Sequence, residues 1–297
     1  MANLHVISGA GGESAQLVVR KIGFADLKDA IAKGYDDFVA MPTHVMLLCV
    51  IYPVVGLVLA RLAFGYDMMP IVFPLAAGFA LVGPLAAIGL YELSRRREEG
   101  LDTSWVHAIE VLRSSSIDAI LAFAVLLVIL FTIWVAAAHA LYQSLFGYGT
   151  PASIGQFLSD IFTTGEGWTL IIAGNALGFL FAATVFTISV VTFPLLIDRD
   201  VGAVVAMHTS VKAVLLNPVV MAAWALFIVV ALVIGSLPFF VGLAVVMPVL
   251  GHASWHLYRK LVEPGPSPRP TLRGPREGRR YAADFPSAMF PWARNKE

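Results

Sequence analysis

The chain alternates between long apolar segments and short segments that carry most of its charged residues. Each apolar segment is close to the roughly 20 residues that a helix needs to cross about 30 Å of hydrocarbon. The third and fourth exceed this length and are expected to tilt or to project beyond the bilayer. The pattern predicts an all-α polytopic membrane bundle of six transmembrane helices, at residues 43–64, 70–93, 118–145, 168–196, 218–235 and 238–258.

Shorter segments have apolar residues at helical spacing on one side only. Residues 23–41 are predicted to form an amphipathic helix that lies on the membrane surface. Similar short helices are expected at 103–115 and 201–215, each leading into a span. The apolar positions of the first of these helices are Phe24, Leu27, Ile31, Tyr35 and Phe38.

Two local patterns mark helix starts. Ser153 and Gln156 match a capping box ahead of an apolar stripe, so we expect an interfacial helix at 153–162. Asn217 precedes Pro218. This pair is typical of a helix start, because an asparagine side chain can cap the first turn and proline needs no amide partner there.

Lys and Arg are unevenly distributed among the connecting segments. The loop at 146–167 contains neither, whereas Arg95, Arg96 and Arg97 follow the second span. Cytoplasmic loops are enriched in these residues, so that loop is predicted to lie outside and both termini in the cytoplasm. The expected parts are a disordered N-terminus at 1–22, a cytoplasmic helix at 23–41, a transmembrane domain at 42–262 and a disordered Pro- and Arg-rich tail at 263–297.

The composition excludes an ordinary soluble globular domain, because 58% of the residues are hydrophobic and only 13% are charged. The 20 Lys and Arg residues equal the 20 Asp and Glu residues in number. The net charge therefore gives no reason to expect a nucleic-acid partner, and the lipid bilayer is the expected surrounding. One cysteine, Cys49, excludes an intramolecular disulfide.

The end of the last apolar segment contains the strongest candidates for chemistry. His252 and His256 are four residues apart and share one helix face, which suits two ligands of one metal ion. His208 lies on the apolar side of the 201–215 helix and is the third candidate ligand. A metal or haem bound by these residues is one hypothesis.

The same stretch fits a second interpretation without a cofactor. Trp255, Tyr258, Arg259 and Lys260 combine an apolar body with a polar tip. Such residues are enriched where a helix meets the lipid headgroups. A membrane-interface belt is then expected at the cytoplasmic face. The sequence alone leaves both interpretations open.

Polar and small residues in the other spans indicate helix packing. Glu92 is followed by Arg95 and Arg96 at helical spacing, which is typical of an ion pair. Gly174 and Gly178 form a GxxxG pattern that allows close helix approach, and Asn175 between them can hydrogen-bond across the contact. This contact lies either inside one bundle or between two copies.

Motifs for a reaction are absent from the sequence. It contains no phosphate-binding loop and no dinucleotide fingerprint, and Ala253 follows His252 where a zinc-protease helix would have Glu. No catalytic residue is therefore assigned, and a protein without enzymatic activity is favoured.

Three stretches resemble a known family: Phe193 to Trp224, Pro74 to Arg96, and Pro248 to Leu261. Over residues 24–262 the chain is similar to an uncharacterised bacterial family of predicted six-span integral membrane proteins with a domain of unknown function. Members of this family are sometimes labelled cytochrome c oxidase subunit I-like. The resemblance implies a bacterial inner-membrane protein, but it supplies no activity.

Three functional hypotheses follow. The first is a non-enzymatic accessory, assembly or regulatory protein that associates with other membrane protein subunits, in a respiratory or other energy-transducing complex, or with further copies of itself. The second is a metal- or haem-binding membrane protein that uses the histidines. The third is a transporter of a small apolar or amphipathic molecule.

Overall fold

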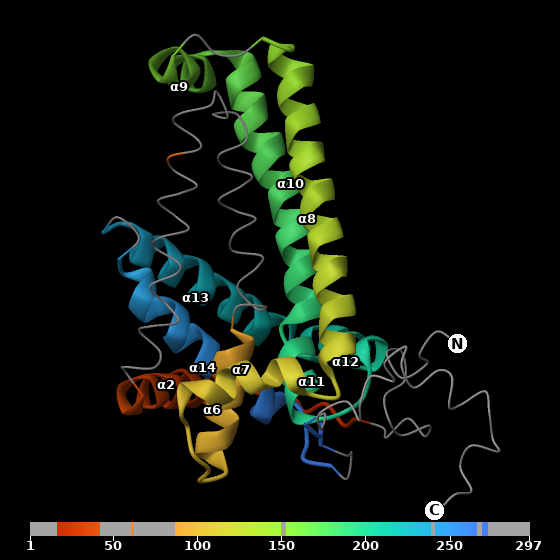
Figure 1. Ribbon diagram of the computed structural model, residues 1–297. Coiled ribbons are helices and arrows are strands. Elements are labelled where there is room, and N and C mark those ends of the chain that lie inside the picture. Colours follow the sequence, from red (N-terminus) through yellow and green to blue (C-terminus); the bar gives the residue numbers. More distant parts are fainter. Residues whose placement is uncertain are drawn as a thin grey trace, which may run out of the picture.

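The computed structural model describes residues 17–41, 61, 87–149, 153–238, 241–265 and 269–272. The first predicted span, apart from residue 61, and most of the second lie outside these residues. Within them, all regular secondary structure is helical, and the only β-type pairings are two isolated bridges. This agrees with the predicted all-α class (Figure 1).

The helices form a long arm and a base (Figure 1). In the arm, α8 rises from the base, α9 crosses the far end, and α10 runs back beside α8. At the base lie α2, α6, α7, the 3-10 turn η1, α11 and α12, and the α13 to α14 hairpin leans against it. The bounds are α2 Phe24–Ala40, α6 Ile88–Glu98, α7 Trp105–Glu110, η1 Val111–Arg113, α8 Ile117–Phe146, α9 Ile154–Thr163, α10 Gly165–Ser189, α11 Thr192–Asp198, α12 Ala203–Leu216, α13 Pro218–Ser236 and α14 Leu243–Leu261.

Three helical stretches among the described residues are long and apolar enough to cross a membrane: Ile117–Phe146, Gly165–Asp198 and Pro218–Ser236. They coincide with the third, fourth and fifth predicted spans. The sixth predicted span corresponds to α14, which is not among the three because its C-terminal half contains two histidines, Arg259 and Lys260. The prediction of six spans therefore stays a prediction.

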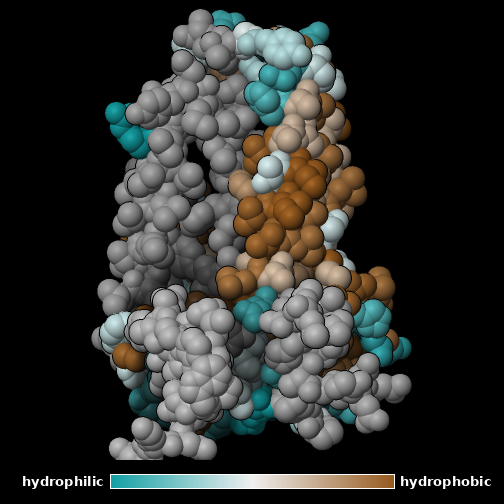
Figure 2. All heavy atoms as spheres, turned by 45° about the vertical axis from the view of Figure 1, so that its right-hand side comes forward, coloured by the Kyte–Doolittle hydropathy of each residue, from teal (hydrophilic) through white to brown (hydrophobic). Residues whose placement is uncertain are grey.

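The arm exposes a band of apolar side chains along its length. Leu121, Val125 and Val128 of α8 and Ile172 and Phe179 of α10 are each more than half exposed. Figure 2 shows this band between hydrophilic residues at the two ends of the arm. Such a surface is stable in hydrocarbon and costly in water.

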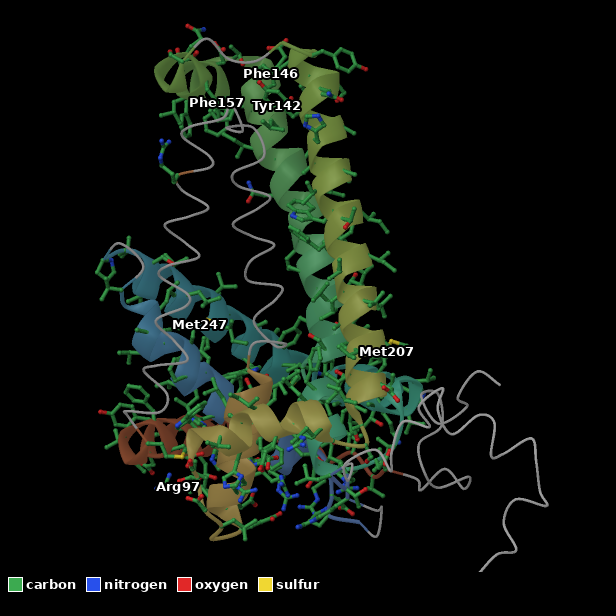
Figure 3. The ribbon with its side chains drawn as sticks, in the orientation of Figure 1. Arg97, Tyr142, Phe146, Phe157, Met207 and Met247 are labelled. Atoms are coloured by element: carbon green, nitrogen blue, oxygen red, sulfur yellow. The ribbon has the colours of Figure 1, made fainter. Side chains whose placement is uncertain are left out.

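Helix α9 contacts the far end of α8 through aromatic side chains, and polar side chains stabilise its first turns. The α8 side chains Tyr142 and Phe146 stack at 5.1 Å, and Phe157 of α9 lies 6.2 Å from Tyr142 (Figure 3). Ser153 caps α9 by accepting from the Gln156 amide at 3.1 Å, which is one half of the predicted capping box. The Gln156 side chain bonds to Asp160 at 2.7 Å.

The base depends on a close approach between α2 and α14. A Cβ atom added to Gly34 would lie 2.5 Å from the Ala253 amide nitrogen, so only glycine fits there. The buried residues of α2 are Leu27, Ala30, Gly34 and Asp37. Of the predicted apolar stripe, Leu27 is buried in this contact, whereas Phe24 is 60% and Tyr35 is 55% exposed.

The segment before α2 pairs with the segment that follows α14, through backbone hydrogen bonds at the base. The amide of Arg20 donates to Leu261 O at 2.8 Å, and that of Glu263 donates to Val18 O at 3.0 Å.

Asn217 precedes α13, but its side chain does not cap that helix. Its amide oxygen accepts from the Ile22 amide at 2.8 Å instead. Residues 17–22 thus belong to the folded base, whereas residues 1–16 lie outside the described part.

The start of the C-terminal tail also lies against the base. The Ser115 amide donates to Thr271 O at 2.9 Å, and Arg269 lies 2.8 Å from Glu99. Beyond residue 272 the predicted disordered tail falls outside the described residues.

Candidate functional site

The two histidines of α14 lie close to a buried carboxylate on α2. Asp37 is 3% exposed. Its Oδ2 accepts from Ser94 Oγ of α6 at 2.6 Å and from His256 Nε2 of α14 at 2.9 Å. Its Oδ1 pairs with Arg97, which is also on α6 and is labelled in Figure 3. One side chain therefore joins three helices, and we call Asp37, Ser94, Arg97, His252 and His256 the Asp37 cluster.

The bonding pattern determines which nitrogen of His252 carries a proton. Nδ1 of His252 lies 2.6 Å from Ser94 Oγ. The serine hydroxyl has one proton, which it donates to the Asp37 carboxylate, so Nδ1 must donate to Ser94. In the neutral imidazole Nε2 is then the unprotonated nitrogen, and it is buried without a hydrogen-bond partner among the described residues.

Local sequence explains how these groups meet. His252 and His256 are one turn apart and point to one side of α14. Asp37 follows Gly34 by three residues and thus lies on the α2 face that packs against Ala253. Ser94 and Arg97 are also three residues apart on α6. The glycine lets the α2 backbone come near enough for the carboxylate to reach both partner helices.

Asp37 is held in its charged form. Burial by itself would raise the pKa of this carboxyl, but the hydrogen bonds from His256 and Ser94 and the nearby histidines outweigh burial, and the pKa lies below the ordinary value. A charged carboxylate at this position stabilises the contact between α2 and the two helices. Removing it would leave Arg97 and His256 without their shared acceptor.

A second buried network lies one turn further along α14. The Tyr258 hydroxyl donates to Asp198 Oδ2 of α11 at 2.6 Å, and Arg259 Nη1 lies 3.4 Å from the same atom. Trp255 Nε1 donates to Glu98 of α6 at 3.0 Å. The α14 helix is thus bonded to α2, α6 and α11 through side chains on its last three turns.

The predicted membrane-interface residues have two different environments. Trp255 and Tyr258 are each 1% exposed, so their rings lie inside the protein and do not reach headgroups. Lys260 is partly exposed and lies 2.8 Å from Asp29 of α2. Arg259, also partly exposed, pairs with Glu98 at 3.2 Å. Only these two cations have an environment that is compatible with the predicted belt.

The predicted metal ligands do not gather into one group. His208 is on the exposed side of α12, whereas His252 is fully buried. Among the described residues, no group of three or more His, Cys, Asp or Glu side chains is placed to hold a metal ion. Because Nε2 of His256 is bonded to Asp37, a metal shared with His252 would need Nδ1 of His256.

The ion pair predicted at the end of the second span is present. Arg95 donates to both oxygens of Glu92, at 2.7 and 2.8 Å, and Arg96 lies 3.7 Å from Glu92. The partly buried residue His107 has a carboxylate on each nitrogen, Glu110 at 2.6 Å and Asp102 at 2.9 Å. The pKa of His107 is raised, chiefly by its hydrogen bond with Glu110 and further by its hydrogen bond with Asp102.

The GxxxG segment of α10 packs against α8 within the same chain. A Cβ atom on Gly178 would lie 3.1 Å from the Trp134 ring, and one on Gly174 would lie 3.9 Å from Leu141. Asn175 donates to Ile171 O of its own helix at 2.7 Å, so this bond does not cross the helix contact.

Sequence reasoning missed Asp37, Ser94 and Asp198 as centres of these networks. A usable signal was present for Asp37, because it continues the spacing of Leu27, Ala30 and Gly34 on one helix face. An acid in register with small and apolar residues is a candidate for a buried, paired carboxylate. Ser94 carries no comparable signal, since serine is common at exposed helix positions.

Residues 72–198 match the model of a family described as predicted integral membrane protein (DUF2189). This match confirms the family resemblance over that segment, which contains two of the three candidate spans, Ile117–Phe146 and Gly165–Asp198. The DUF2189 segment contains Ser94, Arg97 and Asp198, whereas Asp37 and both α14 histidines lie outside it. Comparison with curated proteins and with solved structures gives no match.

Proposed function

We propose that this integral membrane protein is a non-enzymatic accessory, assembly or regulatory protein of a bacterial inner membrane, with both termini in the cytoplasm. In this proposal the spans anchor the base, and the base contacts a larger membrane complex of the respiratory or another energy-transducing type. The observation that carries the proposal is the use of buried acid and base groups as bonds between helices. Asp37 joins α2, α6 and α14, and Asp198 joins α11 to α14.

Such bonding favours a rigid platform over a reactive site. Buried ionic and polar groups that are fully paired hold helices in one arrangement. Each proton donor of the Asp37 cluster that a reaction would need is already bonded to another side chain. A fixed base at the end of apolar spans is suited to present a constant surface to a partner.

The exposed apolar side of α13 also supports this proposal, because lipid or another protein must cover it within the membrane. Only 22% of the most apolar 18-residue stretch of α13 is buried in the protein. Val219, Leu226 and Val229 are each more than half exposed. Lipid, another subunit or a second copy would remove this surface from water.

Isolation under mild conditions tests the proposal. The protein would be expressed at natural levels with an affinity tag, cross-linked in intact membranes, and extracted in a gentle detergent. A stoichiometric membrane partner that remains with the wild type and is lost in Asp37→Asn is expected. A monomer without any cross-linked partner would overturn the proposal.

A metal- or haem-binding function is the alternative, and one observation favours it. Nε2 of His252 is a buried acceptor without a partner among the described residues, and an unprotonated imidazole nitrogen is a common metal ligand. Metal analysis and an absorption spectrum of the purified protein test this alternative. It predicts bound metal or haem that is lost in His252→Ala and retained in His208→Ala, and it fails if the wild type contains neither.

A further inference from the structure

Helix α12 has a buried face that determines which side of it points outward. Ala206, Thr209, Ser210 and Ala213 are buried. Ser210 Oγ donates to Thr187 O at 2.8 Å and accepts from the Val191 amide at 3.2 Å. These two bonds fix α12 to the junction between α10 and α11. The orientation of its outer face is therefore set by the fold.

The outer face of α12 is apolar with one lysine in it. Val204 is 49% exposed and Leu215 is 73% exposed. His208 and Lys212 are exposed between them. The four positions are spaced by about one helical turn and so share one side of the helix. In water this surface would leave its valine and leucine side chains unfavourably exposed.

The face lies where the spans meet the base. Figure 1 places α12 at the foot of α8 and α10, at the end opposite α9. Met207, labelled in Figure 3, lies on the outside of this foot. After α12 the chain enters α13, where Val219 is 68% exposed. The apolar outer face of α12 thus continues along the chain into the surface that the bilayer covers.

Lys212 supplies a charge that lacks a protein partner. Ion pairs connect many Lys and Arg side chains of the base to acids, but Lys212 has no ion pair with any described residue. Helix α12 itself contains no Asp or Glu. A lysine in an apolar helix face can place its alkyl chain among acyl chains and its ammonium among headgroups.

The helix that leads into α8 shows the same combination. Trp105 is 42%, Ile109 is 48% and Leu112 is 65% exposed. Arg113 follows them and is exposed, and it acts on the Glu110 carboxylate at longer range without a direct ion pair. The α7 helix and the η1 turn also lie at the base end of α8 in Figure 1. Two separate segments that each precede a span therefore have an apolar outer face and a cation.

We propose that the outer face of α12 binds anionic phospholipid of the base-side leaflet, with Val204 and Leu215 among the acyl chains and the Lys212 ammonium on the lipid phosphate. The occupant is lipid because the face continues into a membrane span and carries positive charge without acid. The surface formed by α7 and η1, which includes Arg113, contacts lipid of the same leaflet. This surface would act independently of any protein partner.

Photo-crosslinking in vesicles tests this binding. Purified full-length protein would be reconstituted in phosphatidylcholine that contains a small fraction of photoactivatable phosphatidylglycerol. The yield of lipid adducts on residues 203–216 would be measured by mass spectrometry. Replacing Lys212 by Gln should lower the yield about five-fold, because one lysine near an anionic surface contributes about 1 kcal/mol. Lys212→Arg should retain the yield.

Lys33→Gln is the matched control. It removes the same charge, but Lys33 is already paired with Asp29 at 3.1 Å, so the yield on α12 should stay unchanged. An equal yield in the wild type and Lys212→Gln would overturn the proposal, as would an equal loss in Lys33→Gln. Cross-links between α12 segments of two copies, in place of lipid adducts, would also overturn it.

Discussion

The arm and the base are both helical, but different forces hold them together. In the arm, α8 and α10 meet through apolar and aromatic contacts such as Trp134 on Gly178, and their outer sides are left to hydrocarbon. In the base, buried carboxylates such as Asp37 and Asp198 bond helices that are far apart in sequence. The arm tolerates apolar exchange on its lipid side, whereas the base depends on single polar atoms.

The largest expected effect comes from Asp37→Asn in the base. The amide has no charge to offset Arg97, and it cannot accept from Ser94 and His256 as a carboxylate does. Removing one partner of a buried pair costs about 3 to 5 kcal/mol, and we expect the lower end because Arg97 is 38% exposed. The apparent unfolding temperature in detergent measures the loss. An unchanged unfolding temperature would contradict the claim that buried polar bonds stabilise the base.

Gly34→Ala should have the next largest effect. The added methyl group would lie 2.5 Å from the Ala253 amide nitrogen, and neither backbone can move without separating α2 from α14. Overpacking of this kind costs about 1 to 3 kcal/mol. The matched control is Gly155→Ala in α9, where the nearest atom is 3.9 Å away. The same thermal assay should show a loss for Gly34→Ala only.

Tyr258→Phe should have a smaller effect of about 1 to 2 kcal/mol, because it removes one hydrogen bond to a buried carboxylate and preserves the ring. Tyr148→Phe is its control, since Tyr148 is 89% exposed. If Tyr258 were only a headgroup anchor, stability in detergent would be equal in the two variants. The comparison therefore separates a buried bond from a membrane belt.

The smallest expected effect concerns His107 of α7, which is partly buried. Its raised pKa means that the charged imidazole favours the folded state. This contribution is complete below the unfolded pKa of about 6.5 and is lost as the pH rises through the higher folded value. NMR titration of labelled histidine measures the folded pKa. Glu110→Gln should lower it, and an unchanged value would show that Glu110 is not the main cause.

The difference between the arm and the base also explains which parts the sequence could predict. The spans at 118–145, 168–196 and 218–235 agree with Ile117–Phe146, Gly165–Asp198 and Pro218–Ser236 to within a few residues. Length and apolar content decide these helices, and both are local properties of the sequence. The bounds of α2 were predicted equally well, at 23–41 against Phe24–Ala40.

The packing of the base depends on information that periodicity does not contain. The apolar spacing predicted a helix on the membrane surface and gave no partner for α2, whereas in the structure Leu27, Ala30, Gly34 and Asp37 are buried, and the small side chains allow close helix approach. Phe24 and Tyr35 are exposed instead. Likewise Trp255 was predicted at the lipid interface and is buried against Glu98. Which partner a polar tip meets is decided by helices distant in sequence.

Hydrogen exchange tests most directly whether Asp37 joins α2 to the rest of the base. Peptides that cover α2, α8 and α10 would be compared by mass spectrometry in wild-type protein and Asp37→Asn. Faster exchange in α2 together with unchanged exchange in α8 and α10 is the predicted result, because the arm does not use this carboxylate. Unchanged protection of α2, or an equal loss across the arm, would contradict the account.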